Sequence, residues 1–219
     1  SRQLSQQSEY CASMGAACAT LLWRVSRCEE SIQAILVGSR VDEFLSLVCT
    51  TVDSYTQVIQ GSDMTPSQGP GELTEETQFV LALCGIITNI AASAYGRDFL
   101  MRHVQGKEVL NVFLRVLAEA PLERCAKMKT LLLMCLYNIS INQEGLKYLR
   151  TQSGLLGLLA WIIQEPGDNE NCLHSLRLIQ SLLYDDESKP PDTLIHQARE
   201  VVTVGLLQHL SSDKRAEVQ

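Results

Sequence analysis

Hydrophobic positions recur at spacings of three and four residues along almost the whole chain, and stretches that alternate strictly between apolar and polar residues are absent. This periodicity is typical of amphipathic α-helices and not of strands. Three polar stretches containing Gly, Pro or Ser interrupt the pattern, at residues 61–71, 165–168 and 185–192. They divide the chain into helical blocks of about forty residues, a length at which helical repeats have to be considered before a single bundle.

The helical blocks align with one another in sequence. At an offset of 49 residues, Asn89-Ile90 matches Asn138-Ile139 and Gly96 matches Gly145, so one register accounts for two helices and the glycine between them. We expect each glycine to end its Asn-bearing helix. Arg24 and Gln180 occupy the Asn column of the first and fourth blocks. Apolar residues follow this column 21 and 24 positions later in every block: Leu45, Val48, Leu110, Phe113, Leu159, Ile162, Val201 and Val204.

A block with a long apolar helix, a glycine turn and two further helices is typical of armadillo repeats. The predicted fold is all-α, an armadillo-like right-handed α-solenoid of about four to five helical repeats. We expect one domain over residues 1–219, with repeats at 9–60, 72–120, 121–166 and 168–219 and a loop at 61–71.

The Asn column suggests a binding function for the third helix of each repeat. In such a solenoid this helix lines the concave face, where a carboxamide can donate to a peptide C=O and accept from a peptide N–H at once. The column would then hold the backbone of an extended partner. The alternative is that Asn89 and Asn138 bond only to neighbouring turns of their own solenoid.

Composition and charge exclude several classes of protein. The net charge of −7 and the pI near 5.1 argue against broad binding to a nucleic-acid backbone, although a local basic patch remains compatible with them. The sequence shows no signal peptide and no apolar stretch long enough to span a bilayer. We therefore expect a soluble, intracellular protein that binds neither nucleic acid directly nor a membrane.

The sequence gives little support for a metal site or an enzyme. Its eight cysteines form no C-x-x-C pair, and its four histidines are scattered. Gly-rich phosphate loops, G-x-S-x-G and H-E-x-x-H are absent. We expect no metal, no cofactor and no catalytic residue, most thiols buried in a reducing compartment, and Trp23 and Trp161 packed in the core.

Four segments resemble the armadillo domain of the heat shock factor 2-binding protein family: QQSEYCASMGAACATLLWRVS (6–26), QFVLALCGIITNIAASAYGRDFL (78–100), LLLMCLYNISINQEGLKYL (131–149) and NCLHSLRLIQSLL (171–183). The resemblance covers nearly the whole chain and is weakest from Asp185 onward. It implies a non-catalytic adaptor that binds a largely disordered segment of the breast cancer type 2 susceptibility protein and supports recombinase recruitment in meiotic homologous recombination.

The resemblance also implies partners, an assembly and a location. Heat shock factor 2 is a further expected partner, and the bound segment is expected to bridge armadillo domains into homo-oligomers. The expected location is the nucleus, on meiotic chromosomes, with the cytoplasm as an alternative. We expect the N-terminal coiled coil of the family to be absent from this chain.

The resemblance places the family's important arginine at Arg97, within GRDFL. A guanidinium at the groove edge could fork onto a carboxylate or onto backbone carbonyls of the partner. The alternative is an intramolecular bond to Asp98 or to a carbonyl at a helix end. As an exposed side chain, Arg97 would contribute little to folding. The other candidate partner-binding residues are Asn89, Asn138, Tyr95, Ser93, Arg24, Asn142, His174, Arg177 and Gln180.

A second functional hypothesis does not depend on this family. The chain could be a general armadillo peptide-binding scaffold, for example in nuclear transport or transcription-factor binding. Import scaffolds of that class carry repeated Trp-Asn pairs along the groove, whereas Trp23-Arg24 replaces the pair here and the other blocks lack Trp beside the column.

Overall fold

The computed structural model describes residues 2–61, 74–165, 169–184, 189–203, 205, 206 and 208. All regular structure within these residues is helical, and the predicted all-α class is confirmed. The predicted turn and loop residues 62–71, 166–168 and 185–188 lie outside the described part. The helices in chain order are α1 (Arg2–Val25), α2 (Glu29–Val37), α3 (Val41–Gly61), α4 (Glu75–Ala92), α5 (Ala94–Arg102), α6 (Val104–Glu119), α7 (Leu122–Ser140), α8 (Gln143–Arg150), α9 (Leu155–Gln164), α10 (Asn169–Leu183) and α11 (Asp192–Val201).

Two compact units make up the chain, residues 1–132 and residues 133–219, and α7 contributes to both. The predicted range 9–60 covers α2 and most of α1 and α3, and the ranges 72–120, 121–166 and 168–219 contain α4–α6, α7–α9 and α10–α11. Within the described residues no single helix is long and apolar enough to cross a membrane. Only α4 and α5 taken together pass that test, and they are bent by 106° where they meet.

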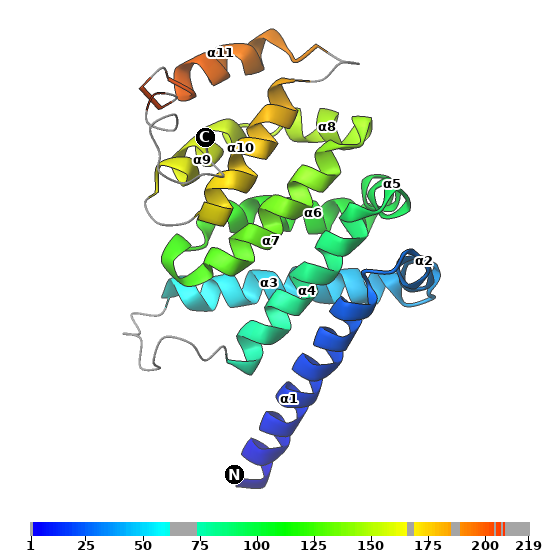
Figure 1. Ribbon diagram of the computed structural model, residues 1–219. Helices are drawn as coiled ribbons and strands as arrows, with labels where there is room; N and C mark the ends of the chain where they lie inside the picture. Colours follow the sequence, from blue (N-terminus) through cyan, green and yellow to red (C-terminus); the bar gives the residue numbers. More distant parts are fainter. Residues whose placement is uncertain are drawn as a thin grey trace. The chain divides into compact units, whose positions relative to one another are not determined.

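The core of the first unit lies around α4, which packs against α1, α3 and α5 (Figure 1). This helix begins at the N-cap Thr74, whose side chain accepts a hydrogen bond from Thr77 N. Every residue from 80 to 88 is buried, as expected for a helix that is apolar on all sides. The apolar columns of the first two repeats are also buried: Leu45, Val48, Leu110 and Phe113 are all 0% exposed.

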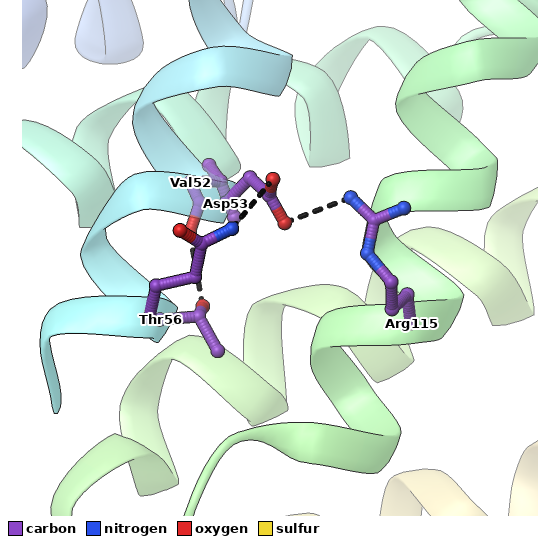
Figure 2. Close-up of polar contacts among 5 residues, drawn as sticks. Val52, Asp53, Thr56 and Arg115 are labelled. Carbon is purple, nitrogen blue, oxygen red and sulfur yellow. Dashed lines mark hydrogen bonds and ion pairs between the residues drawn. The ribbon is translucent and has the colours of Figure 1, made fainter. Parts of the chain in front are cut away.

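Polar contacts join the first two repeats along α3 and α6. Arg115 Nη2 lies 2.7 Å from Asp53 Oδ1, and Figure 2 shows the two side chains facing each other from the two helices. The hydrogen bond to Asp53 raises the pKa of Arg115. Gln60 Nε2 donates to Glu119 O at 2.9 Å. The first two repeats are therefore held together by these polar contacts as well as by the apolar core.

In the second unit, α9 and α10 pack together and α11 packs on both. Leu159, Ile162 and Ile163 are at most 2% exposed, so the predicted apolar column of this repeat is buried. Ser140 Oγ and Ser181 Oγ share a 2.7 Å hydrogen bond near the ends of α7 and α10. In the fourth repeat Val201 is only half-buried, and Val204 lies outside the described residues.

Candidate functional site

The candidate site of the first unit is a cleft between the C-terminal end of α1, α2 and the C-terminal end of α4. It has a volume of about 230 Å³. Asn89 and Ser93 line it, as does Arg27, which the sequence analysis missed. The remaining lining residues are Ser26, Glu29, Ile32 and Ala92. Arg27 follows Arg24 by about one helical turn, and this spacing could have indicated it as a candidate binding residue.

Asn89 is half-buried and uses both amide hydrogens inside the unit. Its Nδ2 donates to Trp23 O at 3.0 Å and to Ser26 Oγ at 2.9 Å. Ser26 is fully buried and its hydroxyl donates back to Trp23 O at 2.8 Å. Asn89 therefore bonds to a neighbouring part of its own solenoid, which is the alternative to partner binding stated above. What the side chain still offers a partner is the acceptor atom Oδ1, not a donor and acceptor together.

We expect Asn89→Ala to lower the free energy of unfolding by about 1–3 kcal/mol, because Trp23 O and the buried Ser26 hydroxyl each lose a donor. Asn89→Asp keeps the shape and the acceptor but removes the donors, so its loss should be similar. Urea unfolding of the three proteins measures this. The exposed Gln33→Ala on α2 is a control that should change little. A stable Asn89→Ala protein with weak partner binding would instead favour the purely functional role.

Ser93 and Asn142 occupy the same repeat position and have the same local role. Each is the N-cap of the following helix, and its side-chain oxygen accepts from the amide of the glycine three residues later, Gly96 or Gly145. Asn142 also accepts from Glu144 N at 2.9 Å. Capping of this kind satisfies the free N–H groups at a helix start. Both predicted partner-binding residues therefore have a local structural task, and Ser93 is buried.

The prediction that the glycine of each repeat ends the Asn-bearing helix is wrong. The helix α4 ends at Ala92, and Gly96 lies in the first turn of α5; α7 ends at Ser140, and Gly145 lies in the first turn of α8. The glycine is required by a close contact: an added Cβ would lie 2.0 Å from Ile90 O at Gly96 and 2.2 Å from Ile139 O at Gly145.

Arg97 follows this glycine in α5 and bonds to the end of α4. Its Nη1 donates to Ala91 O at 3.1 Å and to Ala92 O at 2.8 Å, two of the carbonyls that a helix leaves unpaired at its C-terminus. This bond to carbonyls at a helix end is the intramolecular alternative to partner binding that the sequence predicts. Arg97 is half-buried, so it contributes more to folding than the exposed side chain that was expected. Its Nε and Nη2 have no partner among the described residues.

Tyr95 lies on another part of the surface of α5. It is 41% exposed and lines a separate cleft of about 340 Å³ together with Asp98, Phe99, Arg102 and His103. In this cleft the rings of Phe99 and His103 stack at 4.6 Å, and His103 Nε2 lies 3.3 Å from Asp42 Oδ1. Tyr95 therefore does not line the Asn89 cleft. Arg24 is exposed on α1 and does not line it either.

The candidates of the second unit lie on α7, α8 and α10. Asn138 and His174 are half-buried, and Arg177 and Gln180 are exposed on α10. His174 Nδ1 and the Oγ of the neighbouring Ser175 are buried and have no hydrogen-bond partner within the described residues. Burial, and then the charge of Arg177, lower the pKa of His174.

This shift predicts a pH dependence of the second unit. A histidine of the unfolded chain has a pKa near 6.5, and His174 has a lower one when folded. Between the two values the unfolded chain binds more protons, so the free energy of unfolding should fall as the pH drops through about 6.5. His174→Gln should reduce this fall. The matched control is His196→Gln, at an exposed position of α11. Urea titrations at about pH 7 and about pH 5.5 measure the difference, and equal slopes in all three proteins would contradict it.

The thiols and tryptophans divide between the core and the surface. Cys84, Cys125, Cys135 and Cys172 are buried, Cys49 is half-buried, and Cys11, Cys18 and Cys28 are exposed. The prediction that most of the eight thiols are buried therefore holds for only four of them. Burial raises the pKa of the Cys84 thiol to about 12. The described residues hold no group of three or more His, Cys, Asp or Glu placed to bind a metal ion.

The core prediction for Trp161 is wrong. This side chain is 47% exposed and lines a cleft of about 650 Å³ between α9 and residues at and after the end of α11. Trp23, in contrast, is half-buried and packs against Gly85 of α4.

Comparison with known proteins identifies the family. The sequence model of the heat shock factor 2-binding protein ARM-like domain matches residues 12–144 and 153–219. The heat shock factor 2-binding protein of the mouse, Mus musculus, is 41% identical over 186 residues, which are 85% of this chain and 52% of the mouse protein. The chain thus spans about half the length of that relative. On this evidence the chain belongs to the heat shock factor 2-binding protein family and carries its ARM-like domain.

Proposed function

We propose that this chain is a non-catalytic adaptor that binds an extended protein segment at the Asn89 cleft, with Arg97 as the principal anchor. The observation that carries the proposal is the position of the Arg97 guanidinium. One nitrogen is fixed on Ala91 O and Ala92 O. Arg97 is not itself a lining residue of the cleft, but its guanidinium lies beside Ala92, which is one. A guanidinium held in this way loses little conformational entropy when its other nitrogens bind a carboxylate or carbonyl of a partner.

The other polar groups of the cleft are complementary to a peptide backbone. Asn89 Oδ1 can accept from a backbone N–H, since only Nδ2 is engaged inside the unit. The Arg27 side chain is exposed and lines the same cleft, and it can donate to a carbonyl. The cleft is small, and its lining includes the apolar side chains of Ile32 and Ala92. These features suit an extended strand of main chain better than a small molecule, whose sites are usually larger and more enclosed.

The proposed partner is a disordered segment of the breast cancer type 2 susceptibility protein, and the proposed role is to support recombinase recruitment in meiotic homologous recombination. Membership of the family supports both, as does the resemblance of GRDFL, which contains Arg97, to the GREFL-like sequence of the family. The corresponding location is the nucleus, on meiotic chromosomes. The mouse relative is named for binding heat shock factor 2, and we propose this factor as a second partner, to be tested by co-precipitation with the wild-type chain.

Calorimetric titration with a peptide from the susceptibility protein tests the proposal. We expect Arg97→Ala to weaken binding about tenfold to a hundredfold, as for charged hydrogen bonds worth about 1.5–3 kcal/mol. Because Arg97 also caps α4, the melting temperature should fall slightly, and the titration is done well below it. Arg40→Ala is the charge-matched control, since Arg40 is exposed and pairs with Glu43.

Each outcome of the titration has a distinct meaning. Equal weakening by Arg97→Ala and Arg40→Ala would show that only net charge matters and would overturn the anchor. No binding by the wild-type chain would overturn the proposed partner and favour a general armadillo scaffold with another ligand. Light scattering during the titration measures whether the bound segment bridges domains into homo-oligomers, which would appear as a mass above one-to-one.

A further inference from the structure

The cleft beside Trp161 belongs to the second unit and has no lining residue in common with the Asn89 cleft. Its volume of about 650 Å³ lies within the range of roughly 300–1,000 Å³ that is usual for ligand sites. One side of it is formed by α9, and the other by the last residues of α11 and the residues that follow them. The segment binding proposed above uses none of these residues.

The α9 side of the cleft presents one large aromatic side chain among small neighbours. Gly157, Ala160, Trp161 and Gln164 line it, and their spacings place them on one face of the helix. Gly157 has no side chain, and an added Cβ would meet no described atom within 4 Å. Ala160 is buried, whereas Trp161 is 47% exposed. This side of the cleft therefore leaves much of the Trp161 indole accessible to a ligand.

The α11 side of the cleft supplies a carboxylate and apolar side chains. Leu206 N donates to Thr203 Oγ1 at 3.2 Å, which holds the turn that follows α11. Val201 and Leu206 are the apolar residues of this side. Among the described residues that line the cleft, Glu200 is the only charged one. Glu200 is exposed and makes no ion pair with any described residue. Its charge is thus available to a cationic ligand.

We propose that this cleft binds an arginine side chain presented by an exposed segment of a partner protein. A guanidinium can lie against the face of an indole and also donate two hydrogen bonds to a carboxylate. Trp161 and Glu200 line the same cleft from its two sides, so one arginine can contact both. The ligand brings positive charge to a chain whose net charge is −7. Val201 and Leu206 suit apolar neighbours of the arginine.

Nuclear magnetic resonance of the indole N–H groups tests the proposal on the whole chain. Trp23 and Trp161 are the two tryptophans, and a Trp161→Phe variant assigns their signals. Titration with the probe acetyl-Leu-Arg-Leu-amide should shift the Trp161 signal, with a Kd on the order of 1 mM for so small a contact. The Trp23 signal should not move. The same tripeptide with citrulline, which has the shape of arginine without its charge, should bind at least about tenfold more weakly.

Two variants alter the cleft from its two sides. Glu200→Gln keeps the size of the side chain but removes its charge, and should weaken binding of the arginine probe about tenfold. Gly157→Leu places a side chain in the cleft and should abolish the shift. The charge-matched control is Glu170→Gln at an exposed position of α10. It should change the Kd less than about twofold, because salt screens distant exposed charges. Circular dichroism and thermal melting show that each variant is folded.

Three outcomes would overturn the proposed recognition of arginine. Equal binding of the arginine and citrulline probes would show that charge is not recognised. Equal weakening by Glu200→Gln and Glu170→Gln would show that only net charge matters. A Trp161 signal that stays in place at about 10 mM probe, ten times the expected Kd, would show that the cleft is not a binding site.

A further variant tests whether the cation comes from a separate protein. Lys214 and Arg215 of the same chain lie outside the described residues. If Lys214→Ala/Arg215→Ala moves the Trp161 signal without any probe, the chain supplies its own cation, and a separate partner is overturned. An unchanged signal supports the partner. Neither result depends on the segment proposed to bind at the Asn89 cleft, so the two proposals fail or hold independently.

Discussion

Replacing Gly96 by alanine is expected to lower the free energy of unfolding by about 3 kcal/mol or more, at the upper end of what overpacking costs. The new Cβ would lie 2.0 Å from Ile90 O and 2.7 Å from the Ile90 carbonyl carbon. Both are backbone atoms at the end of α4, so no side-chain rotation relieves the contact. Gly145→Ala should cost a similar amount in the second unit, because its Cβ would lie 2.2 Å from Ile139 O.

The matched control is Gly157→Ala, which adds the same methyl group to an exposed position within α9. An added Cβ there meets nothing within 4 Å. Since glycine in a helix costs roughly 0.5–1 kcal/mol relative to alanine, this variant should be slightly more stable than the wild type. Urea unfolding followed by circular dichroism compares the three proteins. Equal stability of Gly96→Ala and Gly157→Ala would show that the α4–α5 corner opens without cost and would contradict the expectation.

The sequence pattern located the Asn-Ile and Gly columns but not the reason for the glycine. A glycine after a long helix is a common C-terminal signal, and on that basis the helix was expected to end there. In the structure Ser93 and Asn142 form the corner, each as an extended cap residue, and the next helix has already begun when the glycine is reached. The glycine faces a carbonyl six residues earlier across that corner. A contact of this kind depends on the angle between two helices, which periodicity along the chain does not specify.

The candidate site was predictable to the extent that it repeats. Asn89 emerged from its column and Arg97 from its motif, because both signals are local in sequence. The hydrogen-bond partner of Asn89 was harder to predict from the sequence. Asn89 donates to Trp23 O, which is 66 residues away, and a donor used inside the fold looks the same in sequence as a donor left for a ligand. Trp161 illustrates the same limit. Apolar periodicity placed it in a Leu-rich helix, but the helices that pack on α9 leave that side of it exposed.

Gly85→Ala is expected to weaken the attachment of α1 to α4 and to lower the free energy of unfolding by about 2–3 kcal/mol, the upper range for overpacking. An added Cβ would lie 2.0 Å from Trp23 Cε2 and 2.1 Å from Trp23 Nε1. The indole therefore lies directly on the bare Cα of Gly85. The ring can escape only by turning toward solvent or by moving the end of α1, where Asn89 bonds to Trp23 O. Indole fluorescence in a Trp161→Phe background should shift to longer wavelength.

The double variant Gly85→Ala/Trp23→Leu separates this contact from a general effect of the methyl group. Trp23→Leu alone should be destabilising because it leaves space over Gly85, and the alanine methyl should then partly fill that space. The combined loss should thus be smaller than the sum of the two single losses, by about 1 kcal/mol or more, as for residues in direct contact. Strict additivity, with no fluorescence shift in Gly85→Ala, would mean that Trp23 does not pack on Gly85. In that case α1 would be held by Asn89 and Ser26, and Asn89→Ala should destabilise the unit more than Gly85→Ala does.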